Sequence, residues 1–138
     1  MGAPDKPGTV TRGILNASRP MILKIEKREL DRNVVVIELN GRLALGRESS
    51  HVEPEVVAAL KNGARIIVLD VSGVGHIDST GIGILAYCFG KATQASAELR
   101  VAGAQPAVLD LLRITRLDRV VPFFPDVDSA LENIGRLV

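Results

Sequence analysis

Segment 77–83 reads Ile-Asp-Ser-Thr-Gly-Ile-Gly, which places a carboxylate, Asp78, directly before two hydroxyls, Ser79 and Thr80. The apolar segment 66–71 before it has the composition of a buried strand, and the residues from Thr80 onward have the spacing of an amphipathic helix. The first amides of a helix lack partners within the helix and lie at the positive end of its dipole. A phosphate on either hydroxyl would gain donors there, so modification would change surface charge without unfolding the chain.

A purely structural role is the alternative for these hydroxyls. Ser and Thr are common helix caps, because their side-chain oxygen accepts a hydrogen bond from an amide of the first turn. Ser79 and Thr80 would then do no more than complete the helix start. The sequence leaves both roles open.

Other patterns suggest catalysis but lack the partners that catalysis needs. Segment 81–86 fits the GxGxxA dinucleotide fingerprint, yet it does not follow the first strand and no acidic residue follows at the expected interval of about 20 residues. Asp70 and Asp78 could form a carboxylate pair, but they bracket a predicted turn at 72–75, where Asp commonly serves turns and caps. Nucleotide binding or hydrolysis would rest on these residues alone, without a P-loop Lys or a GxSxG elbow. We expect a protein that is not an enzyme and that holds no cofactor.

The metal-binding residue types are sparse. His51 and His76 are the only histidines and have no HExxH spacing, so we expect polar loop or helix residues and no metal site. The single Cys88 falls among apolar residues of the predicted helix, which indicates a buried thiol and fits a reducing cytoplasm.

Composition and charge exclude several classes of partner. The 138 residues suit one domain, and a hydrophobic content of 46% with 3% aromatic residues predicts an aliphatic α/β core. Seventeen basic and sixteen acidic residues give a net charge of +1 without charged blocks, so nucleic acid is not an expected partner. No stretch approaches the roughly 20 apolar residues of a spanning helix, so we expect no membrane insertion and a cytoplasmic protein.

Hydrophobic periodicity predicts one α/β domain from residue 21 to residue 138. Residues 1–20 are interrupted by Gly and Pro and predict a disordered N-terminal extension. The expected fold is a mixed sheet of four to five strands, an N-terminal hairpin followed by parallel βα units, packed with about four helices. The expected strands are 22–29, 34–40, 65–71, 99–102 and 120–124, and the expected helices are 48–61, 80–95, 106–113 and one that Asp126 opens and that ends near Gly135.

Four segments resemble those of a known family. Segment 68–83, Val-Leu-Asp-Val-Ser-Gly-Val-Gly-His-Ile-Asp-Ser-Thr-Gly-Ile-Gly, resembles the signature of STAS domains, in particular the bacterial anti-sigma factor antagonists. Segment 34–43 looks like the second strand of that family with its Gly-x-Leu turn, and segments 111–120 and 124–131 look like its last strand connection and final helix. The likeness extends from about Ile22 to Ile134.

The resemblance implies a regulatory binding protein. Such a protein binds an anti-sigma factor with serine/threonine kinase activity, frees a sigma factor, and is switched off when its partner phosphorylates the hydroxyl before the signature Gly, which is Thr80 here, with Ser79 as the alternative. ATP would belong to the partner. The implied partner-binding residues lie together at the helix start: Asp78, Ser79, Thr80, Gly81 and Ile82. For Ile82 a core position is an equal alternative.

Two departures from the family pattern concern the switch. Many members carry Asp at the position of Ala44, and Ser is commoner than Thr at the position of Thr80. Both put the efficiency of phosphorylation in question. The alternative is therefore a STAS scaffold subunit of a stress-signalling or lipid-transport complex, and the sequence leaves the oligomeric state open.

Overall fold

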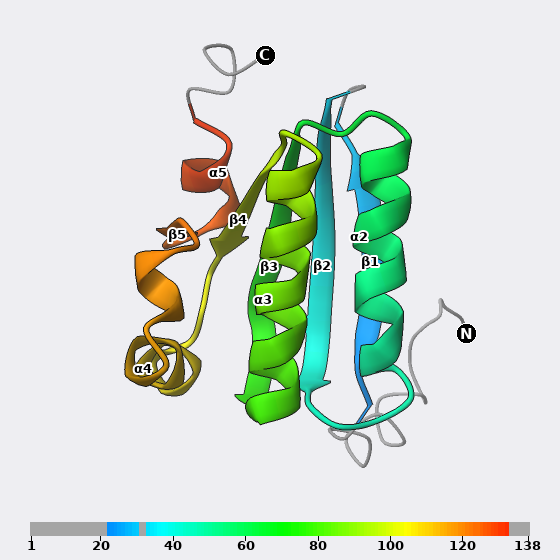
Figure 1. The fold of residues 1–138 in the computed structure, drawn as a ribbon. Coiled ribbons are helices and arrows are strands. Elements are labelled where there is room, and N and C mark those ends of the chain that lie inside the picture. The colour runs from blue at the N-terminus through cyan, green and yellow to red at the C-terminus, as the bar shows by residue number, and fades with distance from the viewer. Residues whose placement is uncertain (1–21, 31–32, 133–138) are drawn as a thin grey trace, which may run out of the picture.

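A five-stranded sheet organises the computed structural model, which describes residues 22–30 and 33–132 (Figure 1). The strands follow one another across the sheet in the order of the sequence. They are β1 (Lys24–Glu29), β2 (Val34–Leu43), β3 (Ile66–Ile77), β4 (Glu98–Ala102) and β5 (Phe123–Phe124). The helices are α2 (Val52–Lys61), α3 (Ser79–Gln94), α4 (Pro106–Ile114) and α5 (Val127–Ala130), with 3-10 turns η1 (Ser49–His51) and η2 (Leu117–Arg119).

The strand pairing confirms the predicted topology. β1 pairs with β2 in antiparallel fashion, and β2, β3, β4 and β5 pair in parallel. A short connection suffices for an antiparallel pair, whereas parallel neighbours need a crossover, which α2, α3 and α4 supply. The chain is thus a hairpin followed by βα units.

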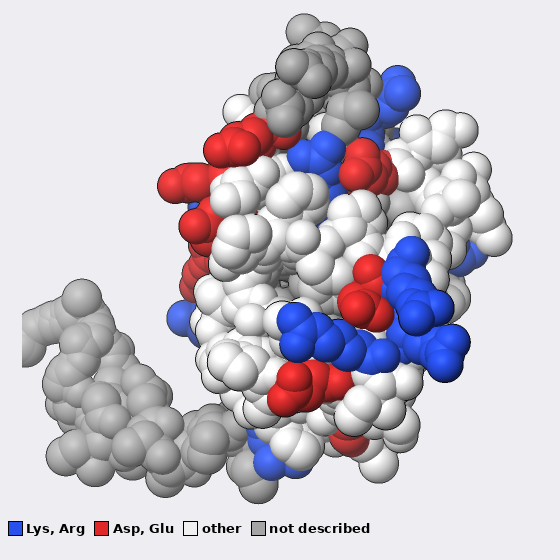
Figure 2. Space-filling model, turned by 90° about the vertical axis from the view of Figure 1, so that its left-hand side faces the viewer, with Lys and Arg blue, Asp and Glu red and all other residues white. Residues whose placement is uncertain are grey.

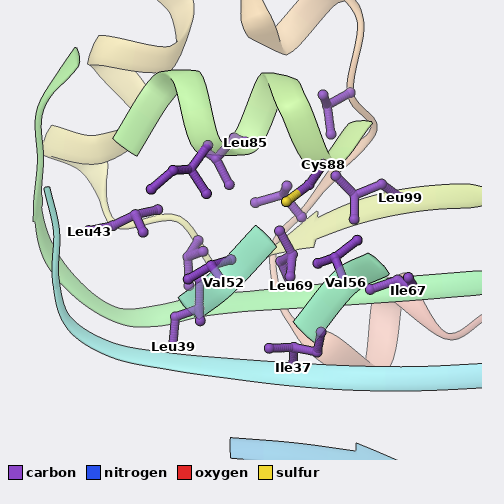
Figure 3. Close-up of a cluster of buried hydrophobic side chains, with 14 of the residues drawn as sticks. Ile37, Leu39, Leu43, Val52, Val56, Ile67, Leu69, Leu85, Cys88 and Leu99 are labelled. Atoms are coloured by element: carbon purple, nitrogen blue, oxygen red, sulfur yellow. The ribbon is translucent and has the colours of Figure 1, made fainter. Parts of the chain in front are cut away.

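Alternate residues of the central strands face two separate apolar layers. The larger core lies between the sheet and α2, α3 and α4, and Figure 3 shows side chains of β2, β3, β4, α2 and α3 meeting there. On the opposite face, Val36 and Val68 belong to a smaller cluster that includes Ala130 of α5. This period-two alternation follows from the strand geometry and explains why β2 and β3 read as continuous apolar runs: both of their faces are covered.

The predicted turn at 72–75 is wrong, because β3 continues through it to Ile77. Two register shifts make this possible: β3 advances by one extra residue between Asp70 and Gly73, and by another between Val74 and His76. A bulge inserts one unpaired residue into a strand and bends it. The glycines that suggest a turn therefore mark a bulged strand, and β2 likewise continues through the predicted Gly-x-Leu turn to Leu43.

The C-terminal part has less regular structure than predicted. Of the expected strand 120–124, only Phe123–Phe124 pairs with β4; η2 ends at Arg119 just before it, and residues 120–122 are not in a strand. Asp126 does cap the last helix, since its Oδ1 accepts a hydrogen bond from the Ser129 amide at 2.8 Å. That helix ends at Ala130, whereas the predicted end near Gly135 and the predicted extension 1–20 lie outside the described residues.

Two other helix boundaries follow from local chemistry. α2 begins at Val52 after the single turn η1, so Pro54 is its third residue, where a missing amide costs no helical hydrogen bond. It ends at Lys61, directly before Asn62-Gly63, and Gly63 adopts a left-handed φ of +95°, as the predicted stop signal requires. No helix in the described part of the chain is long and apolar enough to cross a membrane.

Candidate functional site

The start of α3 is organised by Asp78. Its Oδ1 accepts a hydrogen bond from the Gly81 amide at 3.0 Å, and its Oδ2 accepts one from the Leu45 amide at 3.1 Å. The Asp78 backbone is extended, as expected of an N-cap residue, and helical geometry begins at Ser79. One carboxylate thus links the helix start to the loop that follows β2.

These hydrogen bonds favour the charged form of Asp78. The Leu45 amide and then the Gly81 amide hold the pKa of the carboxyl below its usual value, while partial burial opposes them. The Thr80 amide and the electrostatic effect of nearby His76 lower the pKa further. Asp78 is therefore ionised at neutral pH, and the site carries a negative charge before any modification.

The two hydroxyls are not the caps of the helix. Ser79 and Thr80 occupy the first two helical positions, and neither hydroxyl forms a hydrogen bond within the described residues. The predicted capping role is therefore wrong for the Ser79 and Thr80 side chains, because Asp78 caps the helix. Ser79 is exposed and Thr80 is half-buried, so both are outside the sealed core.

Gly81 sets how closely α3 approaches the end of β2. A Cβ atom at this position would lie 2.1 Å from the Leu43 carbonyl oxygen and 2.6 Å from Cγ1 of Ile77. Gly81 itself is buried, so its role is to let α3 pack closely against the end of β2 and not to contact a partner. Gly83, two residues later, is exposed and has nothing within 4 Å of such a Cβ.

Two apolar side chains lie near this helix start. Ile82 is half-buried and packs against the main core, so the core position weighed for it is its principal environment. Leu45 is 83% exposed although it is a large apolar residue, and it was not among the predicted site residues. The signal that could have found it is an apolar residue two positions after Leu43 of the predicted Gly-x-Leu turn, followed by Gly46. The hydrogen bond to Asp78 holds its backbone at the site.

Ala44, at the position where many family members carry Asp, lies in the loop after β2. Ala44 is buried, and its amide donates a hydrogen bond to the Ser49 hydroxyl at 3.1 Å. Ser49 is itself buried at the start of η1. The loop after β2 is therefore held by Ser49 at Ala44 and by Asp78 at Leu45.

The other candidate residues do not join this site. Asp70 Oδ1 accepts hydrogen bonds from the Ser72 amide and hydroxyl beside the first bulge, and Asp78 follows it by eight positions, just past the end of β3, about 26 Å away at the ordinary rise of a strand. A paired-carboxylate site is therefore excluded. His51 and His76 are exposed on η1 and β3. Among residues 22–30 and 33–132, no group of three His, Cys, Asp or Glu side chains could hold a metal ion.

The fold and this site define a small α/β domain with free hydroxyls at the start of a helix beside a strand end. A family model described as the STAS domain matches residues 24–130, and the chain belongs to this family. The resemblance seen in segment 68–83 is confirmed.

Solved structures of antagonists have the same fold. An anti-sigma factor antagonist from Mycobacterium paratuberculosis is 25% identical, with a TM-score of 0.69 over 81% of this chain and 93% of that chain. A Thermotoga maritima protein assigned as a candidate anti-sigma factor antagonist is 24% identical, with a TM-score of 0.72 over 81% of this chain and 95% of that chain. The anti-sigma factor antagonist SpoIIAA, in its unphosphorylated form, is 16% identical, with a TM-score of 0.69 over 83% of this chain and 99% of that chain.

Proposed function

We propose that this chain is an anti-sigma factor antagonist that binds an anti-sigma factor with serine/threonine kinase activity and so releases a sigma factor in the cytoplasm. The observation that carries the proposal is the pair of hydroxyls at Ser79 and Thr80, which Asp78 leaves free by capping α3 itself. Family membership and the likeness to the Mycobacterium antagonist support it. In this proposal the chain is a substrate of its partner and not an enzyme, and it needs no cofactor of its own.

The unmodified surface has features of a docking site. Leu45, whose backbone amide is bonded to Asp78, supplies an exposed apolar side chain in the loop beside the helix start that carries the uncharged hydroxyls of Ser79 and Thr80. An apolar contact surrounded by small polar groups can be desolvated at low cost, because few charges lose their water. Asp78 fixes the geometry of this surface rather than contacting the partner, because both of its oxygens already accept hydrogen bonds.

Phosphorylation would make the same surface costly to desolvate. A phosphate on Thr80 adds about 1.5 to 2 negative charges beside the ionised Asp78. In a docked interface those like charges would lose water without gaining a matched cation, so binding would weaken sharply. Thr80 is the proposed position because it directly precedes Gly81, and Ser79 is the alternative because it is the more exposed hydroxyl.

The partner of the full chain is first identified by pull-down and mass spectrometry, and the test then combines the full chain with this purified partner and ATP. Incorporation is followed by intact mass and the modified residue is located by peptide sequencing. We expect one phosphate on the parent, none on Thr80→Ala, and full labelling of Ser79→Ala. Thr80→Ala should keep binding to the kinase, whereas Thr80→Glu should weaken it. Labelling of Thr80→Ala to the level of the parent would move the site to Ser79, and absence of any complex would reject the antagonist function.

A scaffold function remains a second proposal because of Ala44. This residue is buried between Leu43 and the exposed Leu45, so the loop offers no acidic side chain where many antagonists have one. A STAS subunit of a stress-signalling or lipid-transport complex would need the docking surface without the switch. Native mass measurement separates the two: a stable large assembly without a kinase supports the scaffold, and a stoichiometric complex with a kinase supports the antagonist.

A further inference from the structure

A second surface, formed by the end of α4, η2 and β5, has features that the Thr80 site does not use. It contains a hollow of about 420 Å³, a size in the range of ligand pockets. The apolar part of its lining comes from α4, from the loop after β4, and from β5 with the residue that follows it: Ala104, Leu109, Phe123, Phe124 and Pro125. Arg113 and Asp118 complete the lining.

Exposed apolar residues lie next to this hollow in the chain. Ile114 is 75% exposed at the end of α4, and Val120 is 53% exposed directly after η2. Scattered apolar residues are normal on a surface, but Ile114 directly follows the lining residue Arg113 and Val120 lies two positions after the lining residue Asp118. Leu117, between them, is buried and holds the segment against the core.

Arginines surround the same segment. Arg113 pairs with Asp110 at 3.6 Å, whereas Arg116 and Arg119 have no ion-pair partner among the residues that the structure describes. Figure 2 shows Lys and Arg side chains gathered over one part of this face, with a smaller number of acidic side chains between them. Segment 116–119 carries these two arginines and Asp118, so its net charge is positive and favours an acidic partner.

Arg116 has a backbone conformation that favours glycine. Its φ of +64° is left-handed, a conformation that glycine adopts without strain and that costs an arginine about 1 kcal/mol. A charged residue kept at such a position is a local inconsistency of the kind found at functional sites. The strain does not identify a partner by itself. It does indicate that the turn does not require an arginine at this position.

We infer that this surface docks an acidic segment of a partner protein, which inserts one apolar side chain into the hollow and pairs its carboxylates with Arg116 and Arg119. A hollow with aromatic walls suits a protruding side chain, whereas an anionic membrane would present a flat surface; the observations therefore favour a protein segment. This inference does not depend on the proposed antagonist function, because it uses none of the residues around Thr80.

The test uses two synthetic peptides and the full chain at low salt. One peptide is rich in glutamate and has a single central phenylalanine, and the other replaces every glutamate by lysine. Fluorescence polarisation measures affinity, and amide chemical shifts of the labelled chain locate the contact. We expect saturable binding of the acidic peptide only, with shifts at Leu109, Val120 and Phe123, and weaker binding as salt is raised.

Two variants, each of which replaces one arginine by glycine, test whether Arg116 itself binds the acidic peptide. Arg116→Gly should keep or raise the thermal midpoint, because glycine suits the left-handed turn, yet it should weaken the acidic peptide by about tenfold. Arg47→Gly removes an exposed arginine from the loop beside the Thr80 site and should leave affinity unchanged. No binding of the acidic peptide, equal binding of both peptides, equal effects of the two variants, or binding only to phosphatidylserine vesicles would overturn the inference.

Discussion

The amide of Leu45 donates a hydrogen bond to Oδ2 of Asp78 at 3.1 Å, although the two residues are 33 positions apart in the chain. The other oxygen of the same carboxylate caps α3 at Gly81. The relation between the exposed leucine and the two free hydroxyls is therefore fixed by one side chain.

Replacing Asp78 with Ala should destabilise the protein by about 1 to 2 kcal/mol, because a helix cap and a long-range hydrogen bond are lost together. Urea denaturation measures the change. Asp110→Ala is the matched control: its ion pair with Arg113 at 3.6 Å is exposed and should contribute less than about 0.5 kcal/mol. Equal losses in the two variants would show that Asp78 does not organise the site.

The contribution of Asp78 should also depend on pH. Hydrogen bonds from the Leu45 and Gly81 amides place its folded-state pKa below the ordinary value of 3.8. The stabilisation is therefore fully present above about pH 4 and is lost as pH falls through the folded pKa, since protonation then favours the unfolded chain. Urea midpoints of the parent and of Asp78→Asn, measured from neutral pH downward, should converge below about pH 4. A constant difference between them would contradict this assignment.

Gly81→Ala should strongly destabilise the protein, by about 2 kcal/mol or more, because the added methyl would overlap the Leu43 carbonyl oxygen at 2.1 Å. Gly83→Ala makes the same chemical change on the exposed side of the same helix, where nothing lies within 4 Å. It should be neutral or stabilising by up to about 1 kcal/mol, since alanine is the better helix former. Thermal unfolding of both variants gives the comparison, and similar midpoints would refute the close approach.

Local pattern was enough to predict the sheet topology. The apolar run 66–71 and the helical spacing after Thr80 reflect burial on both strand faces and on one helix face, which sequence periodicity records directly. The continuation of β3 through Gly73 could not be predicted this way. Gly73 fits there because its missing side chain makes room for Asn40 of the neighbouring strand, a contact that depends on register.

The site was predictable in its residues but not in its roles. The order Asp78-Ser79-Thr80 identifies a helix start, yet three adjacent residues can each cap a helix, and propensity does not choose among them. The choice falls on Asp78 because only its carboxylate also reaches Leu45, through a contact made by the loop after β2. Leu45 and Ser49 were missed for the same reason, since their roles come from tertiary contacts.

Arg100 should hold α5 on the sheet. It is buried, donates a hydrogen bond from Nη1 to the Ala130 carbonyl oxygen, and lies 5.4 Å from the centre of the Phe124 ring. Arg100→Met should therefore cost about 2 kcal/mol and raise amide hydrogen exchange at Ala130 and Leu131 before other regions. Arg65→Met, at an exposed arginine, is the control and should change neither measurement. Unchanged exchange at α5 in Arg100→Met would contradict this role.

Cys88 should be unreactive in the folded protein. It is fully buried in α3 between the helix and the sheet (Figure 3), and burial, aided by the negative charge of Glu53, raises its pKa from 9.0 to about 12. A thiol reagent should therefore modify the parent only at the rate of unfolding.

The same shift predicts a loss of stability in alkali. Above about pH 9 the unfolded chain releases a thiol proton that the folded chain retains, so the free energy of unfolding falls as pH rises, by at most about 1.4 kcal/mol per pH unit. Cys88→Ala lacks this group and should show a shallower decline between about pH 9 and pH 10. Urea denaturation of both proteins across this interval measures the difference. Equal slopes, or rapid labelling of the folded parent, would show that Cys88 is accessible to water.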